Sequence, residues 1–293
     1  MKGSIVWLIL VLFFRVEISC GQAVCSVSGT YRLVVMEHMS LEAAKIAAVQ
    51  RAKIQALADR FGTNISQNTS TIIKNHNEKN NISFLSLASS DVNGEWISDT
   101  KEPRIEVDTQ DNTFVVTAWV EGKARELTSA GIDVVAKVLR NGTEDKFEDD
   151  EFNSGDDLFL CFESPSDGYL AVYLVDDSQQ AYCLLPYQRN TTGRTMIKGG
   201  KRYLFFSQKH SPTKEEIVDE YGLICEKTEE YNRIYILFSP NEFSKANDAE
   251  SSGEMLPRVL PLENFQKWLT KSRIKDSAMQ VVTKIIAIKN NSH

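Results

Sequence analysis

The sequence has few of the residues on which enzymes and metal sites usually depend. Its 293 residues include only five cysteines and four histidines. No two cysteines form a CxxC or CxxxC pair, which excludes a zinc knuckle. No HExxH, GxSxG, GxGxxG or phosphate-binding loop is present either. The sequence therefore predicts no metal and no cofactor, and it favours a binding protein over an enzyme.

Long apolar runs are also missing beyond the first residues. Ile5–Phe14 is an unbroken apolar stretch that follows Lys2. As a helix it would span about 15 Å, whereas a membrane core needs about 20 residues. Gly21 and Ala23 are small residues two apart, as signal peptidase requires. We therefore expect residues 1–23 to be a signal peptide, and the mature chain to be exported without a transmembrane span.

A lipid anchor is the alternative for this leader. Cys20 precedes Gly21, as in lipoprotein signals, and such a cysteine would carry the lipid. However, Arg15 and Glu17 separate Cys20 from the apolar run. Cleavage after Ala23 is therefore the favoured interpretation, and the compartment is the periplasm, the cell surface or the exterior.

Composition and charge exclude several further classes. About 42% of the residues are hydrophobic and 25% are charged, which is typical of a globular protein and not of a disordered or collagen-like chain. The formal net charge is −7. An acidic chain is poorly suited to nucleic acid, so we expect none as a partner.

The first unit, residues 24–128, has the pattern of an α+β domain. Residues 27–37 are rich in β-branched and aromatic side chains and predict a strand. A helix is expected over Leu41–Phe61, with Ser40 as its N-cap and Gly62 after its last turn. Alanines recur at every fourth position of this helix, which predicts close packing on a sheet. They are Ala44, Ala48, Ala52 and Ala56.

The rest of this unit predicts a second helix and paired strands. A polar segment over residues 63–93 is too long for a plain loop, so we expect an irregular helix around Thr69–Leu87. Strands are expected over residues 94–97 and 104–107, which form one region, and over Thr113–Glu121, ended by Gly122. The order is therefore β-α-(α)-β-β.

The second unit, residues 129–293, reads as a mostly antiparallel β-sheet or sandwich with one late helix over residues 262–272. Pro165–Gly168 and Gly199–Gly200 have the composition of hairpin turns. The turn at Pro165–Gly168 and a second turn at Asp176–Gln180 predict a three-strand meander with Cys161 and Cys183 on its outer strands, in which Cys183 lies opposite about Tyr173. Such strands are about 9.6 Å apart, too far for a disulfide.

An acidic stretch lies near the start of this unit. Glu144–Asp157 contains eight acidic residues and one lysine. It fails as an EF-hand because Ser154 stands where the loop needs glycine and Leu160 where it needs glutamate. A solvated charged loop is the expected structure, with a calcium site of another kind as the alternative.

Several short motifs of this unit together resemble a bacterial domain of unknown function, number 4384, over about residues 132–290. They are Asn153–Asp156, Ser166–Leu170, Leu184–Tyr187, Glu230–Asn232, Ile236–Ser239 and Phe265–Leu269, followed by Arg273 and Asp276. The first unit is faintly similar to N-terminal domains of envelope and flagellar-assembly accessory proteins. These resemblances imply an accessory module of a bacterial envelope.

The predicted function is therefore binding of a partner protein or an envelope glycan. Trp96, Tyr169 and Tyr187 are the candidate binding residues, although a tryptophan such as Trp96 more often anchors a sheet to a helix. The alternative is a hydrolase. It would use a carboxylate pair such as Asp219–Glu220, or His210 with one of Cys161, Cys183 and Cys225.

Overall fold

The computed structural model describes eight ranges of the chain. They are residues 23–35, 39–63, 91–110, 113–127, 131–190, 192–211, 217–247 and 258–290. These residues form an α+β protein that is mostly β-sheet, with one early and one late α-helix. The α+β class predicted from the sequence is thus confirmed. Residues 1–22 of the predicted signal peptide, Cys20 among them, and the helix expected over Thr69–Leu87 lie outside the described residues.

The N-terminal sheet is antiparallel, with a helix on one face. Its central strand, β4, pairs with β1 along one edge, and with β2 and then β3 along the other. The predicted single strand region is therefore two short strands that share one edge of β4. The bounds are β1 (Val24–Val34), α1 (Leu41–Phe61), β2 (Gly94–Asp99), β3 (Arg104–Gln110) and β4 (Thr113–Glu126).

The helix α1 has the predicted bounds because its signals are local. The Ser40 side chain accepts a hydrogen bond from the Ala43 N–H, and Gly62 has a φ of 77°, which favours glycine. The four alanines spaced along α1 are all buried against the sheet. A Cβ on Gly29 of β1 would lie 2.5 Å from the Ala52 carbonyl oxygen. The helix backbone therefore rests directly on the strand.

Gly122 does not end its strand, contrary to the sequence prediction. β4 continues through it to Glu126. A Cβ at this position would lie 2.2 Å from the Trp96 ring, so glycine leaves the space that the indole fills. The isolated glycine marks a close approach of a neighbouring side chain rather than a turn.

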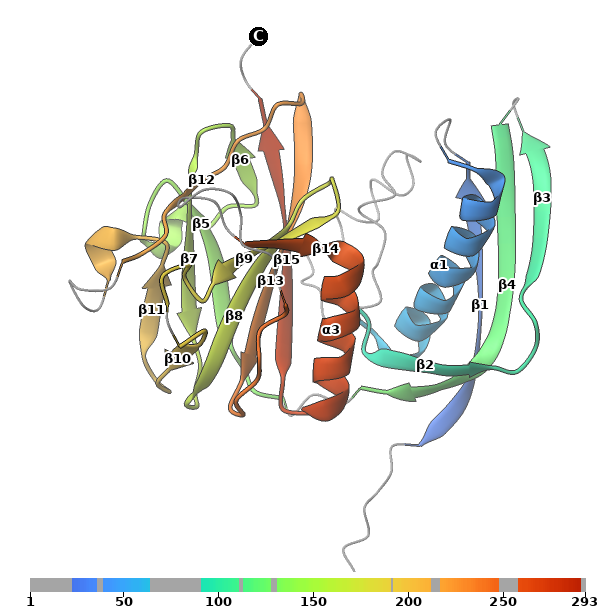
Figure 1. Ribbon diagram of the computed structural model, residues 1–293, viewed down its shortest axis with the longest axis horizontal. Helices are drawn as coiled ribbons and strands as arrows, with labels where there is room; N and C mark the ends of the chain where they lie inside the picture. Colours follow the sequence, from blue (N-terminus) through green and yellow to red (C-terminus); the bar gives the residue numbers. More distant parts are fainter. Residues whose placement is uncertain are drawn as a thin grey trace, which may run out of the picture.

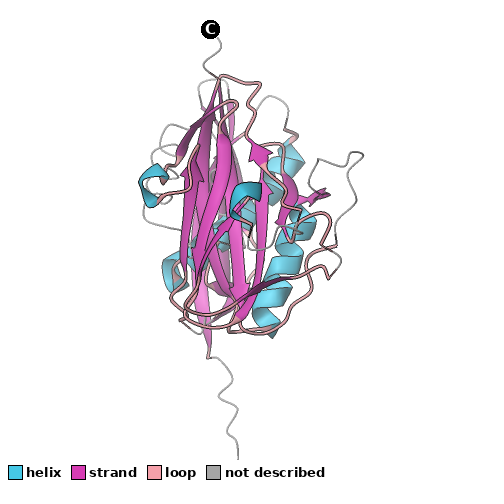
Figure 2. Cartoon of the chain, turned by 90° about the vertical axis from the view of Figure 1, so that its left-hand side faces the viewer, coloured by secondary structure: helices cyan, strands magenta, loops and turns pink. Residues whose placement is uncertain are grey.

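The C-terminal part is a sandwich of two sheets, and Figures 1 and 2 show their strands running in similar directions. The central sheet has the order β14-β9-β8-β13-β15-β6, with β10 also on β8. Its strands are β6 (Glu151–Asn153), β8 (Gly168–Val175), β9 (Gln180–Leu185), β10 (Thr195–Ile197), β13 (Glu229–Ser239), β14 (Arg258–Pro261) and β15 (Gln280–Lys289). The outer sheet contains β5 (Val135–Arg140), β7 (Asp157–Glu163), β11 (Arg202–Phe205) and β12 (Tyr221–Gly222).

The two predicted hairpins are instead corners at which the chain changes sheets. β7 lies in the outer sheet and β8 in the central sheet, while β10 and β11 make the reverse change. The two corners contact each other, because Gly200 N–H donates to the Ser164 carbonyl at 2.8 Å and Gly199 N–H to Asp167 Oδ1 at 2.9 Å. The meander predicted through Cys161 is therefore wrong. Its other arm is right, since Tyr173 lies opposite Cys183.

The central sheet is covered on both faces, which explains the continuous apolar sequence of β13. One face contacts the outer sheet through residues such as Leu170, Ile236 and Phe238. The other face carries α3 (Leu262–Lys275), whose Phe265 and Leu269 are fully buried. Figure 1 shows the resulting layers: outer sheet, central sheet, α3, α1 and N-terminal sheet. Among the described residues, no helix is both long enough and apolar enough to cross a bilayer.

Buried polar contacts join the segment before β2 to the sandwich. Asp91 is 0% exposed, and its carboxylate lies 2.8 Å from Arg233 Nη1 and accepts from the Tyr235 hydroxyl at 3.0 Å. Arg273 of α3 donates to the Val92 carbonyl at 2.7 Å. Burial opposes the charge of Arg233, but Asp91 and Tyr235 together outweigh it and raise the pKa of this guanidinium.

Candidate functional site

Trp96 of β2 contacts α1 and so connects the two elements. Its Nε1 donates to Asp99 Oδ1 at 2.9 Å, and the Lys53 ammonium of α1 lies 5.2 Å from its ring centroid. Lys53 also pairs with Asp99 at 2.7 Å. The lysine, more than the indole, lowers the pKa of the Asp99 carboxyl. These contacts support the anchoring role, and a binding role for Trp96 stays a prediction.

Tyr169 and Tyr187 lie in different surroundings. Tyr187 is 5% exposed and belongs to the core of the sandwich, where its hydroxyl oxygen accepts from the Phe206 N–H at 3.1 Å. Tyr169 is half-buried on β8, between Met196 and Ser239 on the adjacent strands. The structure does not gather these tyrosines with Trp96, which is in the N-terminal sheet.

The residues named for a hydrolase are engaged in other contacts. Burial raises the pKa of the Cys161 and Cys225 thiols, which disfavours the nucleophilic thiolate. All four described cysteines are free thiols. His210 Nδ1 lies 3.0 Å from the hydroxyl of Ser207, a buried residue. No hydrogen bond joins His210 to a cysteine among the residues that the structure describes.

The adjacent residues Asp219 and Glu220 hydrogen-bond to two different loops. Asp219 accepts from the Gln188 N–H at 2.6 Å, and Glu220 accepts from the Gln208 N–H at 2.7 Å. Each carboxylate therefore holds a different backbone segment.

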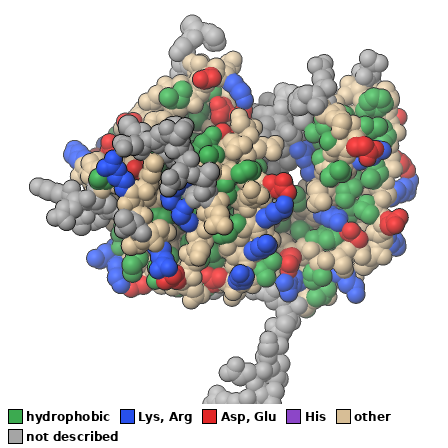
Figure 3. Space-filling view, in the orientation of Figure 1, with side chains coloured by type: hydrophobic (Ala, Val, Ile, Leu, Met, Phe, Trp, Pro, Cys, Tyr) green, Lys and Arg blue, Asp and Glu red, His purple; other side chains and the backbone are tan. Residues whose placement is uncertain are grey.

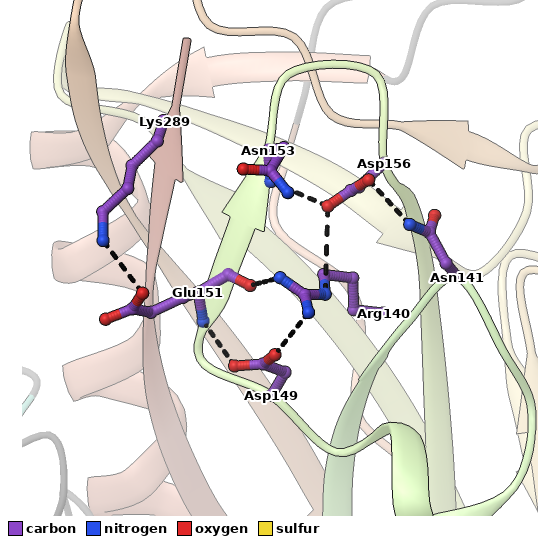
Figure 4. Close-up of polar contacts among 7 residues, drawn as sticks. All are labelled: Arg140, Asn141, Asp149, Glu151, Asn153, Asp156 and Lys289. Atoms are coloured by element: carbon purple, nitrogen blue, oxygen red, sulfur yellow. Dashed lines mark hydrogen bonds and ion pairs between the residues drawn. The ribbon is translucent and has the colours of Figure 1, made fainter. Parts of the chain in front are cut away.

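The acidic stretch is organised around Arg140 of β5 (Figure 4). Its guanidinium lies 3.0 Å from the Asp149 carboxylate and donates to the Glu151 carbonyl at 2.7 Å, with Asp156 at 3.9 Å. Asn141 donates to Asp156 at 2.6 Å. A cation of the protein itself therefore occupies the centre of these oxygens. Within the described ranges, no group of three acidic, histidine or cysteine residues has the arrangement of a metal site.

A groove beside α3 has the chemistry of a binding site. One wall is α3, and the other is the segment 241–247 that follows β13. Its volume is about 920 Å³. The residues lining this α3 groove are Asn241, Glu242, Phe243, Ser244, Lys245, Ala246, Asn247, Leu260, Asn264, Lys267, Trp268, Lys271, Ser272, Lys275, Asp276 and Met279.

Three lysines follow one face of α3 because they are spaced four residues apart. They are Lys267, Lys271 and Lys275. Figure 3 shows basic side chains descending along this helix on the face toward the viewer. Lys267 pairs with Glu263, whose carboxyl pKa it lowers. No ion pair joins Lys271 or Lys275 to another described residue, so their charge is available to a ligand.

The acidic residues of the α3 groove are already engaged. Glu242 pairs with Arg194 at 2.5 Å. Asp276 accepts from the Ser239 hydroxyl at 2.5 Å and from the Asn241 amide at 3.0 Å. The lining contains four lysines against these two acidic residues, so the groove is basic on a chain whose net charge is −7.

Aromatic packing fixes the walls of the groove. Trp268 is half-buried, its Nε1 donates to the Ser244 carbonyl at 3.2 Å, and its ring lies 5.7 Å from that of Tyr173. The Tyr173 hydroxyl in turn accepts from the Ala246 N–H at 3.0 Å. The segment 241–247 is therefore held at a set distance from the helix, which gives a preformed groove.

Sequence reasoning missed this groove. The lysine spacing in the sequence was enough to predict one basic helix face, because residues four apart share a helix face. The opposite wall was not, since the segment 241–247 has the composition of an ordinary loop and reaches α3 only through tertiary contacts.

Comparisons with known proteins do not assign the chain to a family. No family model matches it. A stretch of 99 residues, 30% of the chain, is 27% identical to a protein described as "Probable polyketide synthase 39" from Dictyostelium discoideum. The matched stretch spans about 3% of the length of that protein. The chain is therefore similar to a small part of a polyketide synthase.

Proposed function

We propose that this protein is an exported accessory module of a bacterial envelope that binds an acidic glycan in the α3 groove. The observation that carries the proposal is the row of lysines beside a preformed polar groove. Cations attract carboxylate- or sulfate-bearing polymers, and amide and hydroxyl groups hydrogen-bond to sugar hydroxyls. The groove offers both through Lys271, Lys275, Asn241, Asn264 and Ser272. We propose no catalysis.

The sequence supports the remaining parts of this proposal. The apolar leader at residues 1–23 supports export, with a lipid on Cys20 as the alternative. The change from one helix-bearing sheet to a sandwich supports two domains, residues 24–128 and 129–293. The resemblance of residues 132–290 to the bacterial domain of unknown function supports an envelope role.

A matched pair of charge variants tests the groove. Binding of the purified mature chain to a polyuronate, with neutral dextran as the reference, is measured by titration calorimetry. Lys271→Glu with Lys275→Glu should weaken binding at least about 30-fold, at roughly 1 kcal/mol for each lost lysine contact. Lys123→Glu with Lys209→Glu is the control, since both lysines are exposed outside the groove and the net charge changes equally.

The result separates the candidate functions. Equal losses in the two double variants would show that the polymer responds to overall charge, and the groove would not be its site. The protein could instead fail to bind any acidic polymer but capture one defined envelope protein, and the groove variant could abolish that capture. The ligand of the groove would then be a protein and not a glycan. Hydrolysis of the polymer would favour the hydrolase alternative.

A further inference from the structure

β3 is a strand with an open edge at one end of the molecule. All seven of its residues are exposed. It pairs with β4 along one edge, and no other described strand pairs with it. In Figure 1 it lies at the right-hand end, on the far side of the N-terminal sheet from the sandwich. Its free backbone groups can pair with another strand.

An apolar ledge accompanies this open edge. Ile105 and Val107 lie opposite Ala118 and Val116, so they are on the face of the sheet that α1 covers. The helix does not cover them fully, and Figure 3 shows hydrophobic side chains gathered over this region. The apolar ledge consists of Ile46 at 64% exposure, Ile105 at 38%, Val107 at 41% and Phe114 at 52%.

The other face of β3 is charged. Arg104, Glu106 and Asp108 alternate with the apolar residues along the strand, so all three point to the face away from α1. Arg104 contacts Glu106. No ion pair joins Asp108 to another described residue, which leaves its charge available across the open edge.

The pattern of β3 is complementary to itself in one antiparallel register. With Glu106 on a two-fold axis, Arg104 of each copy lies opposite Asp108 of the other, and Ile105 lies opposite Val107. This register has one like-charge contact, between the two Glu106 side chains on the axis. Shifting the centre to Val107 would create two, because Glu106 of each copy would lie opposite Asp108 of the other, and it would leave no opposite-charge pair. Like charges directly opposite are destabilising. Shifting it to Ile105 would take half of each strand beyond its end. Charge and apolar contact therefore select the register centred on Glu106.

We propose that a second copy of this chain binds along β3 in this register. The two N-terminal sheets then form one continuous sheet across a two-fold interface, with both α1 helices on the same face. The two apolar ledges meet on that face, and two Arg104–Asp108 ion pairs form on the other. The pairing covers the open edge, and it is independent of the α3 groove.

Charge exchange between two variants tests the pairing, with sedimentation velocity of the mature chain as the measurement. Arg104→Asp alone and Asp108→Arg alone should each weaken self-association at least ten-fold, because like charges then face each other. An equimolar mixture of the two should associate again, since one copy then carries two acids and the other two arginines. Thermal melting of each variant establishes that it is folded.

Glu106 supplies a second measurement that is specific to the register. Glu106→Gln removes the like-charge contact on the axis and should strengthen self-association, whereas in the register centred on Ile105 it would remove an Arg104–Glu106 pair and weaken it. The charge exchange excludes the register centred on Val107, because Arg104 would there lie opposite Gln110 and not Asp108. A wild-type chain that stays monomeric at all concentrations would overturn the proposal. So would folded single variants that associate as strongly as the wild type, or a mixture that fails to associate.

Discussion

Asp91 shows how a single buried charge can hold distant segments together. Its carboxylate is fully buried against Arg233 and Tyr235, which lie 142 and 144 positions away in the sequence. Removing one partner of a buried ion pair leaves the other charge uncompensated in a medium of low dielectric constant. The cost of such a loss exceeds that of losing an exposed pair.

We therefore expect Asp91→Ala to lower the free energy of unfolding by about 3–5 kcal/mol. Asp99→Ala, which breaks the more exposed pair with Lys53, should cost less than about 1 kcal/mol. Urea denaturation measures both variants. Similar small losses would mean that the contact between Asp91 and the sandwich is not stabilising.

Gly29 is a second position at which one added atom, a Cβ, should change the stability of the fold. An added Cβ would lie 2.5 Å from the Ala52 carbonyl oxygen and 2.8 Å from the Ala56 Cβ, and the helix backbone cannot yield as a side chain can. Gly29→Ala should lower the free energy of unfolding by about 1–3 kcal/mol or more. Gly222→Ala is the matched strand control, because nothing lies within 4 Å of its Cβ. Chemical denaturation should show no comparable loss there.

The two residues also show what a sequence can predict. The alanine stripe that meets Gly29 was readable because side chains four apart share a helix face. Asp91 was not readable, since it follows a polar segment and its partners come from β13. Local spacing defines a face, but it does not identify what a distant segment brings to that face.

At the scale of elements, the corners at Pro165–Gly168 and Gly199–Gly200 show how much the composition of a turn can predict. Their composition correctly predicts that the chain reverses. Whether the next strand pairs in the same sheet depends on tertiary packing, and here each corner leads to the opposite sheet. The pairing of neighbouring strands was predicted correctly between β8 and β9 but not at the two corners, although all three connections are four residues long.

Much of the acidic stretch is exposed, as its composition predicts, but several of its carboxylates also pair with cations of the protein. Arg202 and then Lys137 bind Asp145 and lower the pKa of its carboxyl to about 2, from an ordinary value of 3.8. A carboxyl with a depressed pKa stabilises the folded state above its unfolded value and loses that contribution as pH falls toward the folded one. The contribution of Asp145 is therefore complete above about pH 4 and lost toward about pH 2.

We expect the stability difference between the wild type and Asp145→Asn to be constant above about pH 4 and to shrink toward pH 2. Thermal melting at a series of pH values measures this difference. Asp133→Asn is the control, because Asp133 is an exposed aspartate in the same part of the chain. A difference between the wild type and Asp145→Asn that does not change with pH would show that the carboxylate is not held by its two cations.

The whole molecule combines an acidic surface with a local basic site. Its net charge of −7 is a property of composition and was known from the sequence. The α3 groove concentrates lysines in one place, which depends on how α3 and the segment 241–247 meet. A polyanion that approaches the proposed site is therefore repelled by the molecule at long range and attracted by the groove at short range.

This opposition predicts an unusual dependence on salt. The Debye length falls from about 30 Å at 0.01 M salt to about 8 Å at 0.15 M, so moderate salt screens the distant acids before it screens the nearby lysines. The affinity for a polyuronate, measured by titration calorimetry, should rise to a maximum at intermediate salt and then fall. The Lys271→Glu, Lys275→Glu variant should lack this maximum. A steady decline of the wild-type affinity from the lowest salt would mean that the acids elsewhere on the chain do not repel the ligand, and that contacts with the groove alone determine binding.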